Sequence, residues 1–421
     1  MINYKQALEI IAKHAKPLEK IEVNISNALG RVCAADITSP EIVPQFNNSA
    51  MDGFAVNSTI LKQASEGNSI ALKVVGSTAA GDSPEKGGEG AWEIMTGAPV
   101  PLGYDAVVKI EDTKTIKKDI EGRPQEISIN ISASPKQNIR DAGEDFQIGD
   151  AILKSGDIIT PEHIMALASL GIANISVQQK PSVAVVSTGK ELVDDIATPL
   201  KSGQIRNSNA PYLLSALSEV NVSASYEGTI HDEPEIFEDS IMELLKGATN
   251  IIISTGAVSM GRYDFIPDSL KKLGAEILFH KVAIRPGKPV LFAKFPNGKF
   301  YFGLPGNPIS AAVGLRFFTY PLIRHLQNLE AESPINARLL MPAKKKQGLR
   351  FFRKAHLSVA VGGKLQLEIL NGQESFKIHP MLQANCWAEF TEEQTGYEVG
   401  EPINIYPLTP NKWILENASW R

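Results

Sequence analysis

With 421 residues, the chain is too long for a single hydrophobic core, and we expect two to four domains. Its composition is ordinary for a globular protein, and the net charge of -5 argues against a protein that coats nucleic acid. Two cysteines, Cys33 and Cys386, are too few for a disulfide framework or a cysteine-based zinc site. Because no run reaches the roughly 18–20 apolar residues of a membrane span and the first segment lacks the apolar core of a signal peptide, we expect a cytoplasmic protein with no membrane partner.

The amino-terminal part is predicted to start with a helix and to continue as β-structure. Residues 4–19 carry apolar side chains at helical spacing, and Pro17 is predicted to close this helix. From about 21 to 180, short β-rich runs alternate with Gly, Pro, Asn and Asp turns, which predicts one or two small β-rich subdomains. A short helix is predicted at 161–170.

From about 181 to 327 the predicted strands and helices alternate. Three segments, 182–193, 251–274 and 300–326, each indicate a buried strand, a Gly-rich turn and a helix. This alternation predicts a parallel or mixed sheet covered by helices on both faces. Beyond about 330, short strands with Gly-Gly and Asn-Gly turns predict a small all-β domain.

The three turns predict a site for an extended anionic ligand. A parallel sheet brings such turns together at the carboxyl ends of its strands, and free N–H groups and small hydroxyls there suit a phosphate or another oxyanion. The candidate binding residues in these turns are Ser187, Thr188, Gly189, Ser254, Gly256, Ser259, Gly261, Pro305, Gly306, Asn307 and Ser310.

Four carboxylates lie beside turns: Asp52, Glu191, Asp232 and Asp264. Carboxylates next to an anion site are expected if Mg²⁺ bridges them to ligand oxygens. The alternatives are helix N-capping by Asp232 and Asp264, and a favourable helix-dipole interaction of Glu191 in a first helical turn.

Three cations follow a predicted strand end in the run KVAIRPGKP. Pro286 and Pro289 restrict the backbone around Lys281, Arg285 and Lys288, so the charges are held in place and suit a fixed oxyanion. The alternative is a solvated basic turn. Asp52 and Thr96 lie far away in the β-rich part of the sequence, so they reach this site only from another domain or subunit, or serve only in their own turns.

Signatures of several other enzyme classes are missing. The sequence has no G-x-x-x-x-G-K-[ST], no G-x-G-x-x-G after a strand and no G-x-S-x-G. Its seven histidines show no metal-ligand spacing. A P-loop enzyme, a dinucleotide-binding Rossmann domain and a hydrolase nucleophile elbow are therefore not indicated.

Several segments together resemble the molybdopterin molybdenumtransferase family, to which the gephyrin E domain belongs. The matching segments are PQFNNSAMDGFAV (44–56), IMTGAPVPLGYDAVV (94–108), NIRDAGEDFQIGD (138–150), ASLGIANISV (168–177), VSTGKEL (186–192), GAVSMGRYDF (256–265), IRPGKPVLFAK (284–294) and GLPGNPISA (303–311). They span nearly the whole chain in consistent order. One departure is Ala257, which occupies a position where glycine is common in the family.

The resemblance implies a multidomain α/β plus β fold: an α/β domain like that of molybdopterin adenylyltransferases, β-rich amino-terminal subdomains and a carboxy-terminal β-barrel. It also implies a homodimer whose active site lies at the subunit interface. The expected division is an amino-terminal helix at 1–20 that packs on the α/β domain, β-rich subdomain I at 21–40 and 138–177, β-rich subdomain II at 41–137, the α/β domain at 178–328 and the barrel at 329–421.

The resemblance further implies a reaction. Adenylylated molybdopterin and molybdate are the expected substrates, Mg²⁺ is the expected cofactor, AMP leaves, and a molybdopterin adenylyltransferase is the expected source of the pterin. The residues implied as catalytic are Asp52, Thr96, Glu191, Asp232, Asp264, Lys281 and Arg285, of which Glu191, Asp232 and Asp264 would hold the metal. Lys288 and Ser310 fall in loops associated with molybdate, and Lys354 and Ser375 match polar positions of the barrel only loosely.

Two alternatives remain open. A scaffold protein without catalysis is disfavoured because it would not need the four carboxylates together with the cations of the IRPGKP segment. An adenylyltransferase is disfavoured because that resemblance covers only about 178–327.

Overall fold

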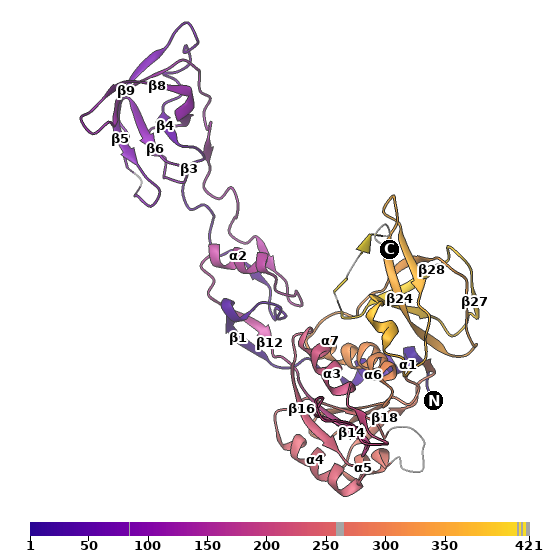
Figure 1. The fold of residues 1–421 in the computed structure, drawn as a ribbon. Coiled ribbons are helices and arrows are strands. Elements are labelled where there is room, and N and C mark those ends of the chain that lie inside the picture. The colour runs from indigo at the N-terminus through magenta and orange to yellow at the C-terminus, as the bar shows by residue number, and fades with distance from the viewer. Residues whose placement is uncertain (84, 258–264, 411, 414–415, 418–421) are drawn as a thin grey trace.

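The computed structural model describes the whole chain apart from residues 84, 258–264, 411, 414–415 and 418–421. Figure 1 shows a long arm of β-structure that leads away from a wider body, in which an α/β unit lies beside a carboxy-terminal β unit. Within the described residues, no helix is long and apolar enough to cross a membrane.

Helix α1 (Tyr4–His14) begins with a capping box, in which the Asn3 side chain accepts from the Gln6 N–H and the Gln6 side chain accepts from the Asn3 N–H. The prediction that this helix reaches residue 19 is wrong, because Ala15 is already extended. Lys16 precedes Pro17, and a residue before proline is disfavoured in helical conformation, so the chain leaves the helix early.

The base of the arm is built from segments far apart in the sequence. Strand β1 (Lys20–Asn24) pairs antiparallel with β12 (Asn174–Gln178), and β2 (Ile37–Thr38) pairs with β11 (Ala151–Leu153). Helix α2 (Pro161–Ser169) covers them through the buried Leu167. The chain therefore runs out along the arm and returns beside its own start (Figure 1).

The far end of the arm is a six-stranded sheet. Its strand order is β7-β4-β6-β5-β9-β8, and short strands β3 (Asn48–Ser49) and β10 (Ile139–Arg140) pair next to it. The strands are β4 (Gly53–Val56), β5 (Ile70–Thr78), β6 (Ala91–Ile94), β7 (Ala106–Lys109), β8 (Thr113–Lys118) and β9 (Pro124–Ile129).

The body contains a mixed sheet with the order β16-β13-β17-β21-β20-β18. Four strands are parallel: β13 (Ser182–Thr188), β16 (Ser223–Ile230), β17 (Ile251–Thr255) and β21 (Phe300–Leu304). The other two, β18 (Glu276–His280) and β20 (Leu291–Lys294), are antiparallel to their neighbours in the order β21-β20-β18. This arrangement confirms the predicted sheet flanked by helices.

Helices cover both faces of this sheet. The apolar run at the start of β17 is buried on both sides, because Ile251 and Ile253 face one core and Ile252 faces the other. The first core includes α1, α3 (Asn209–Ser218), α6 (Pro308–Gly314) and α7 (Tyr320–Leu326), and the second includes α4 (Pro234–Lys246) and α5 (Ile266–Lys272).

A π-helical segment, Leu315–Thr319, joins α6 to α7 in one continuous helix. Pro321 has no N–H with which to continue the regular helical hydrogen bonds. The Tyr320 N–H before it donates to the Leu315 carbonyl, five residues earlier, which is the π-helical pattern. The segment carries Phe317, whose ring stacks on Phe352 with centroids 3.7 Å apart. The helix thereby joins the α/β core to the carboxy-terminal unit.

The carboxy-terminal unit is a closed barrel of five strands, which confirms the expected β-barrel. Strand β24 (Arg350–Val359) pairs with both β25 (Leu365–Ile369) and β26 (Cys386–Phe390), and β22 (Ile335–Leu339) and β28 (Pro402–Pro407) complete the ring β24-β25-β22-β28-β26. Ring closure removes free sheet edges between these strands. The short strand β19 (Ile284–Arg285), which comes from the α/β part, adds to β24.

Candidate functional site

The parallel strands end together at one edge of the α/β sheet. Thr188 is in register with Ile230, and Thr255 is in register with Leu304, so the loops after these strands lie side by side. Because β18 ends and β20 starts at this same edge, the loop that joins them, residues 281–290, lies there too. The structure thus brings together the turns after β13 and β21, the first residues of the turn after β17, and the basic run that the sequence indicated.

Small buried side chains tie the strand ends to one another. Thr188 Oγ1 donates to the Thr255 carbonyl (3.1 Å), and the buried Ser187 hydroxyl accepts from Asn207 Nδ2 (2.9 Å). Gly256 has a φ of +98°, and a Cβ there would overlap the Thr188 carbonyl oxygen. A bulkier residue than glycine would therefore push the loop after β17 away from the loop after β13.

Ser254 and Gly189 serve different purposes. The Ser254 hydroxyl is buried and accepts a hydrogen bond from the Tyr301 hydroxyl on β21, so it lies within the sheet and not at the open edge. Gly189 has a φ of +144°, and a Cβ there would lie 2.8 Å from the carboxylate oxygens of Glu191. Glycine at 189 therefore lets Glu191 fold back over the turn.

The expectation of a helix directly after this first turn is wrong. Residues after Gly189 form the short strand β14 (Leu192–Val193), which pairs with β15 (Ile205–Arg206), and α3 starts only at Asn209. Glu191 consequently belongs to a β-ribbon, and the interpretation that it complements a helix dipole does not apply. Its backbone carbonyl instead accepts from the Ile205 N–H at 2.9 Å.

A polar network that the sequence analysis missed holds this ribbon in place. Asp194 Oδ1 accepts hydrogen bonds from Asn207 Nδ2 (2.8 Å), the Tyr226 hydroxyl (2.7 Å) and Thr229 Oγ1 (2.9 Å). Burial raises the pKa of Asp194, but these hydrogen bonds outweigh it and leave the pKa below its usual value. In the sequence, this network is indicated only by the Asp-Asp pair at 194–195 and by the polar run RNSN at 206–209, where α3 begins.

Two of the predicted metal ligands lie on neighbouring strand ends. Glu191 follows β13 and Asp232 follows β16, and both are exposed to solvent. The N-cap position of α4 is Glu233, so the alternative that Asp232 caps this helix is wrong. The third predicted ligand, Asp264, lies outside the described residues, as do Ser259 and Gly261, and the described part of the chain contains no complete group of three metal-ligating side chains.

The loop after β21 is fixed from two sides. Asn209 Nδ2, at the start of α3, donates to the Gly306 carbonyl at 2.8 Å. The helix predicted after this turn begins at Pro308, with Asn307 as its N-cap. Pro305 is buried, and Gly306 and Asn307 are exposed. Ser310 is 5% exposed on the first turn of α6.

The basic loop packs against this helix start. A Cβ at Gly287 would lie 3.4 Å from the Ser310 carbonyl oxygen, in ordinary contact, so the loop lies against the first turn of α6. Arg285 and Lys288 are exposed, and the Arg285 guanidinium lies 5.8 Å from the centre of the Phe351 ring on the barrel. Lys281 is half-buried with a φ of +73°.

The barrel reaches the same helix start through residues 372–377. The Ser375 carbonyl accepts from the Ile309 N–H at 3.0 Å, which places Ser375 beside Ser310. Lys354 is 0% exposed, and its ammonium donates to the carbonyls of Gly372 (2.6 Å), Glu374 (3.4 Å) and Lys377 (3.1 Å). Its charge is thus directed into the loop that carries Ser375.

Asp52 and Thr96 form a pair, but at the far end of the arm. Asp52 Oδ1 accepts from both the Thr96 N–H (2.6 Å) and the Thr96 hydroxyl (2.8 Å), and these two bonds lower the pKa of Asp52. Both side chains are exposed. Figure 1 shows the six-stranded sheet that carries them well away from the α/β sheet of the same chain.

Charge changes sign along the carboxyl edge. Glu191 and Asp232 lie at the β13 and β16 end, and the cations of residues 281–290 lie at the β20 and β18 end. Three to five strand spacings separate these ends, a distance of roughly 14–24 Å. Gly256 and Ala257 after β17 and the loop after β21 lie between them. This edge suits a ligand with a metal-bridged phosphate at one end and an oxyanion at the other.

Family models cover most of the chain. Residues 2–171 match the MoeA N-terminal region (domain I and II), residues 184–325 match a probable molybdopterin binding domain, and residues 336–408 match the MoeA C-terminal region (domain IV).

Curated relatives and solved structures agree with these models. The chain is 33% identical over 414 residues to a molybdopterin molybdenumtransferase of Synechococcus elongatus, covering 97% of this chain and 100% of the relative. It is 35% identical over 397 residues to one of Haemophilus influenzae, covering 93% and 95%. A crystal structure of a molybdopterin biosynthesis MoeA protein from Pyrococcus horikoshii superposes with a TM-score of 0.80 at 30% identity, covering 97% of this chain and 99% of that one.

Proposed function

The chain belongs to the molybdopterin molybdenumtransferase family, and from this premise we propose that it inserts molybdate into adenylylated molybdopterin with Mg²⁺-dependent release of AMP. The observation that carries the proposal is the single sheet edge that runs from two carboxylates through Gly-rich loops to a group of cations on a loop packed against α6. This order of groups matches a substrate with a pyrophosphate at one end and a tetrahedral dianion to be bound at the other.

The carboxylate end fits Mg²⁺. Glu191 and Asp232 offer exposed oxygen ligands from adjacent strands, and Mg²⁺ is commonly held by one or two carboxylates together with substrate phosphates. Glu191, Asp232 and Asp264 would hold the ion. When bound, the ion supplies positive charge that offsets the charge developing on the phosphate oxygens as AMP leaves.

The chain's own groups position the two substrates. The loop after β13 and Gly256 directly after β17, held by the Thr188–Thr255 hydrogen bond, would present their backbone to the pyrophosphate. At the other end, Arg285 and Lys288 offer positive charge to molybdate, and the packing of Gly287 against Ser310 fixes their loop. Because these groups are fixed before the substrate binds, little reorganisation is needed during the reaction.

The arm residues take part through a homodimer in this proposal. Asp52 and Thr96 form a ready-made acceptor and donor pair that lies far from the α/β edge of its own chain (Figure 1). A second subunit packed in two-fold symmetry would bring its arm to that edge, and each active site would then contain residues of both chains. Lys281 and Arg285 would act opposite this pair.

The remaining parts of the proposal are coarser. We place the division of the chain at 1–20, 21–40 with 138–177, 41–137, 178–328 and 329–421, in keeping with the separate sheets and cores. The protein acts in the cytoplasm and receives its pterin from a molybdopterin adenylyltransferase.

Ser375 of the barrel joins the molybdate end, and the Lys354 ammonium stabilises the loop that carries Ser375.

The test is AMP release from adenylylated molybdopterin with Mg²⁺, measured with and without molybdate. We expect release that depends on molybdate and on Mg²⁺, and a loss of at least about 100-fold in rate for Asp232→Asn, because that change removes a charged metal ligand. Glu233→Gln, the adjacent residue at the N-cap of α4, is the matched control and keeps the rate. Tight pterin binding without AMP release in the wild type would contradict the proposal.

A further inference from the structure

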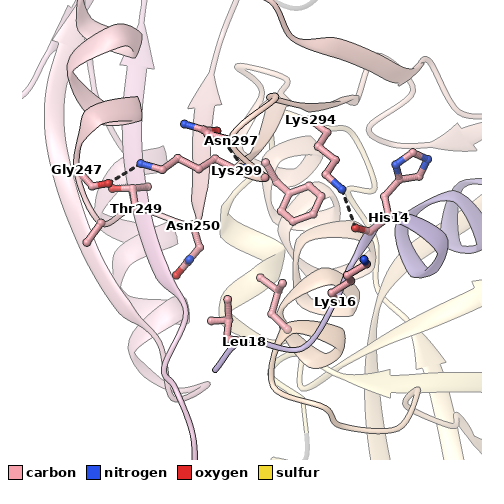
Figure 2. Close-up of a pocket in the computed structure, with 13 residues that line it drawn as sticks. His14, Lys16, Leu18, Gly247, Thr249, Asn250, Lys294, Asn297 and Lys299 are labelled. Carbon is pink, nitrogen blue, oxygen red and sulfur yellow. Dashed lines mark hydrogen bonds between the residues drawn. The ribbon is translucent and has the colours of Figure 1, made fainter. Parts of the chain in front are cut away.

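A hollow opens at the amino edge of the α/β sheet, opposite the candidate functional site (Figure 2). It has a volume of about 330 Å³ and lies where β17 and β21 start, next to Asn250 and Phe300. The candidate functional site lies where these strands end. The two sites lie at opposite ends of the same strands, and a five-residue strand spans roughly 15 Å.

Four separate segments form the walls of this hollow, which we call the amino-edge pocket. They are the end of α1 with residues 14–18, the loop 247–250 after α4, Lys294 at the end of β20 with the hairpin 297–300 that follows, and Leu326 at the end of α7. Hydrogen bonds fix the walls: the Leu18 N–H donates to the Leu326 carbonyl at 2.8 Å, and the Phe300 N–H donates to the Asn250 carbonyl at 2.9 Å. The pocket is therefore preformed.

Its charge is one-sided. His14, Lys16, Lys294 and Lys299 line it, and none of its lining residues is an aspartate or glutamate, although the chain as a whole carries a net charge of -5. Figure 2 shows Lys16 and Lys294 on one side of the hollow and Lys299 on the other. An acidic protein that gathers three lysines around a preformed hollow has a local site for an anion.

The lysines differ in how they are held. The Lys299 ammonium donates to three carbonyls at the end of α4, those of Leu244, Leu245 and Gly247, and so contributes fixed charge. Lys294 donates to the His14 carbonyl at 3.2 Å, and an ammonium has three donors, so it has donors left for a ligand. Lys16 is exposed, and within the described residues its ammonium makes no hydrogen bond to a backbone carbonyl, so it can turn toward a ligand.

We propose that the amino-edge pocket binds a small anion that carries a phosphate group, held by Lys16 and Lys294 over the fixed charge of Lys299. Lysine ammonium groups act as point charges toward phosphate, and the volume exceeds that of the bare ion, which leaves room for a small ester. Lys16 lies in the segment that links α1 to β1 at the base of the arm, so an occupant also joins that link to the α/β sheet.

The test is calorimetric titration of the full chain with inorganic phosphate and with glycerol 3-phosphate at constant ionic strength. We expect Lys16→Glu to weaken binding about tenfold or more, because it replaces an attractive charge by a repulsive one. Lys13→Glu makes the same change in net charge at an exposed position of α1 outside the pocket, and we expect it to alter affinity less than about twofold. Tighter binding of the ester would identify an organic phosphate as the ligand, and equal or weaker binding would identify the free ion; either supports the proposal.

A third variant separates this pocket from the carboxyl edge, which is itself proposed to bind anions. Arg285→Gln removes a cation from that edge, and we expect it to leave phosphate binding at the amino-edge pocket unchanged. The proposal is overturned if no binding is detected, if Lys16→Glu and Lys13→Glu behave alike, or if Arg285→Gln abolishes the signal.

Discussion

At the scale of single residues, two carboxylates have lowered pKa values because neutral groups, and not cations, donate hydrogen bonds to them. Asp52 is held by the N–H and the hydroxyl of Thr96, and Asp194 is held by Asn207, Tyr226 and Thr229. Hydrogen bonds to the charged form lower a carboxyl pKa, so both groups stay ionised under acidic conditions in which a free carboxylate begins to take up a proton.

The first prediction concerns Asp52. Thr96→Val keeps the backbone bond to Asp52 but removes the hydroxyl bond, so we expect the pKa of Asp52 to rise toward its usual value. Thr96→Ser retains a hydroxyl and should leave the pKa low. Carbon-detected NMR titration of the Asp52 carboxyl measures both. An unchanged pKa in Thr96→Val would mean that the backbone N–H alone sets it.

The second prediction concerns Asp194. Asp194→Asn replaces a charged acceptor by a neutral one, and we expect a loss of about 1 kcal/mol in the free energy of unfolding, at the low end of the usual range because the site is open to water. The folded-state pKa lies below the unfolded value of about 3.9, so this contribution is present above pH ~4 and fades as the pH falls through the folded pKa.

Urea denaturation of Asp194→Asn, Tyr226→Phe and the double variant at neutral and acidic pH measures this contribution. The two single effects should not add at neutral pH, because Asp194→Asn weakens the same hydrogen bond that Tyr226→Phe removes. Strict additivity would show that the bond contributes nothing to stability. A stability difference that persisted unchanged far below pH 4 would contradict the role of the charge.

At the scale of elements, local patterns predicted most strands, and particular residues explain the failures. The strands predicted at the start of the segments 182–193, 251–274 and 300–326 are β13, β17 and β21, and each begins at the first residue of its segment. The β14–β15 ribbon was missed because its partners are 13 residues apart and are stabilised by Asp194, not by an alternating apolar pattern. The π-helical segment was missed because it depends on how Pro321 and Phe317 are accommodated at the barrel contact.

In the loops of the candidate site, some features were predictable from local sequence and others were not. Asn307 and Pro308 indicate the start of α6, because capping and proline preferences are local. Ala257 has a φ of +44°, a region that a side chain enters at a cost of about 1–2 kcal/mol, and this fits the glycine that the family commonly has there. The sequence did not indicate that the Lys354 ammonium holds the loop 372–377, because the carbonyls to which it donates lie about 20 residues away along the chain.

The third prediction concerns the element that joins the barrel to α6. Lys354→Met leaves the carbonyls of Gly372 and Lys377 without their donor, and we expect a loss of about 2–3 kcal/mol together with faster hydrogen exchange in residues 372–377. Lys377→Met removes an exposed lysine of the same loop and should change stability by less than about 0.5 kcal/mol. Equal effects of the two substitutions would show that the buried ammonium has no special role in holding the loop.

At the scale of the whole molecule, the pairing of distant segments decides where the candidate residues lie. Strand β1 pairs with β12 about 150 residues later, and β19 leaves the α/β part to join the barrel. No local pattern encodes such pairings, so the sequence could indicate that Asp52 and Glu191 serve one site only through resemblance. The structure separates them within one chain (Figure 1), and this separation makes the dimer proposal testable.

The last prediction is complementation between subunits. Asp52→Asn and Glu191→Gln should each abolish molybdate-dependent AMP release as homodimers. When the two variants are co-expressed in equal amounts, half of the dimers are mixed, and one of the two sites in each mixed dimer combines the intact Asp52 of one chain with the intact Glu191 of the other. We therefore expect about a quarter of wild-type activity. A chain that carries both substitutions, co-expressed with either single variant, should recover none. If all mixtures are inactive although mixed dimers are isolated, each site is built from one chain alone, and the arm must then fold back onto its own α/β sheet.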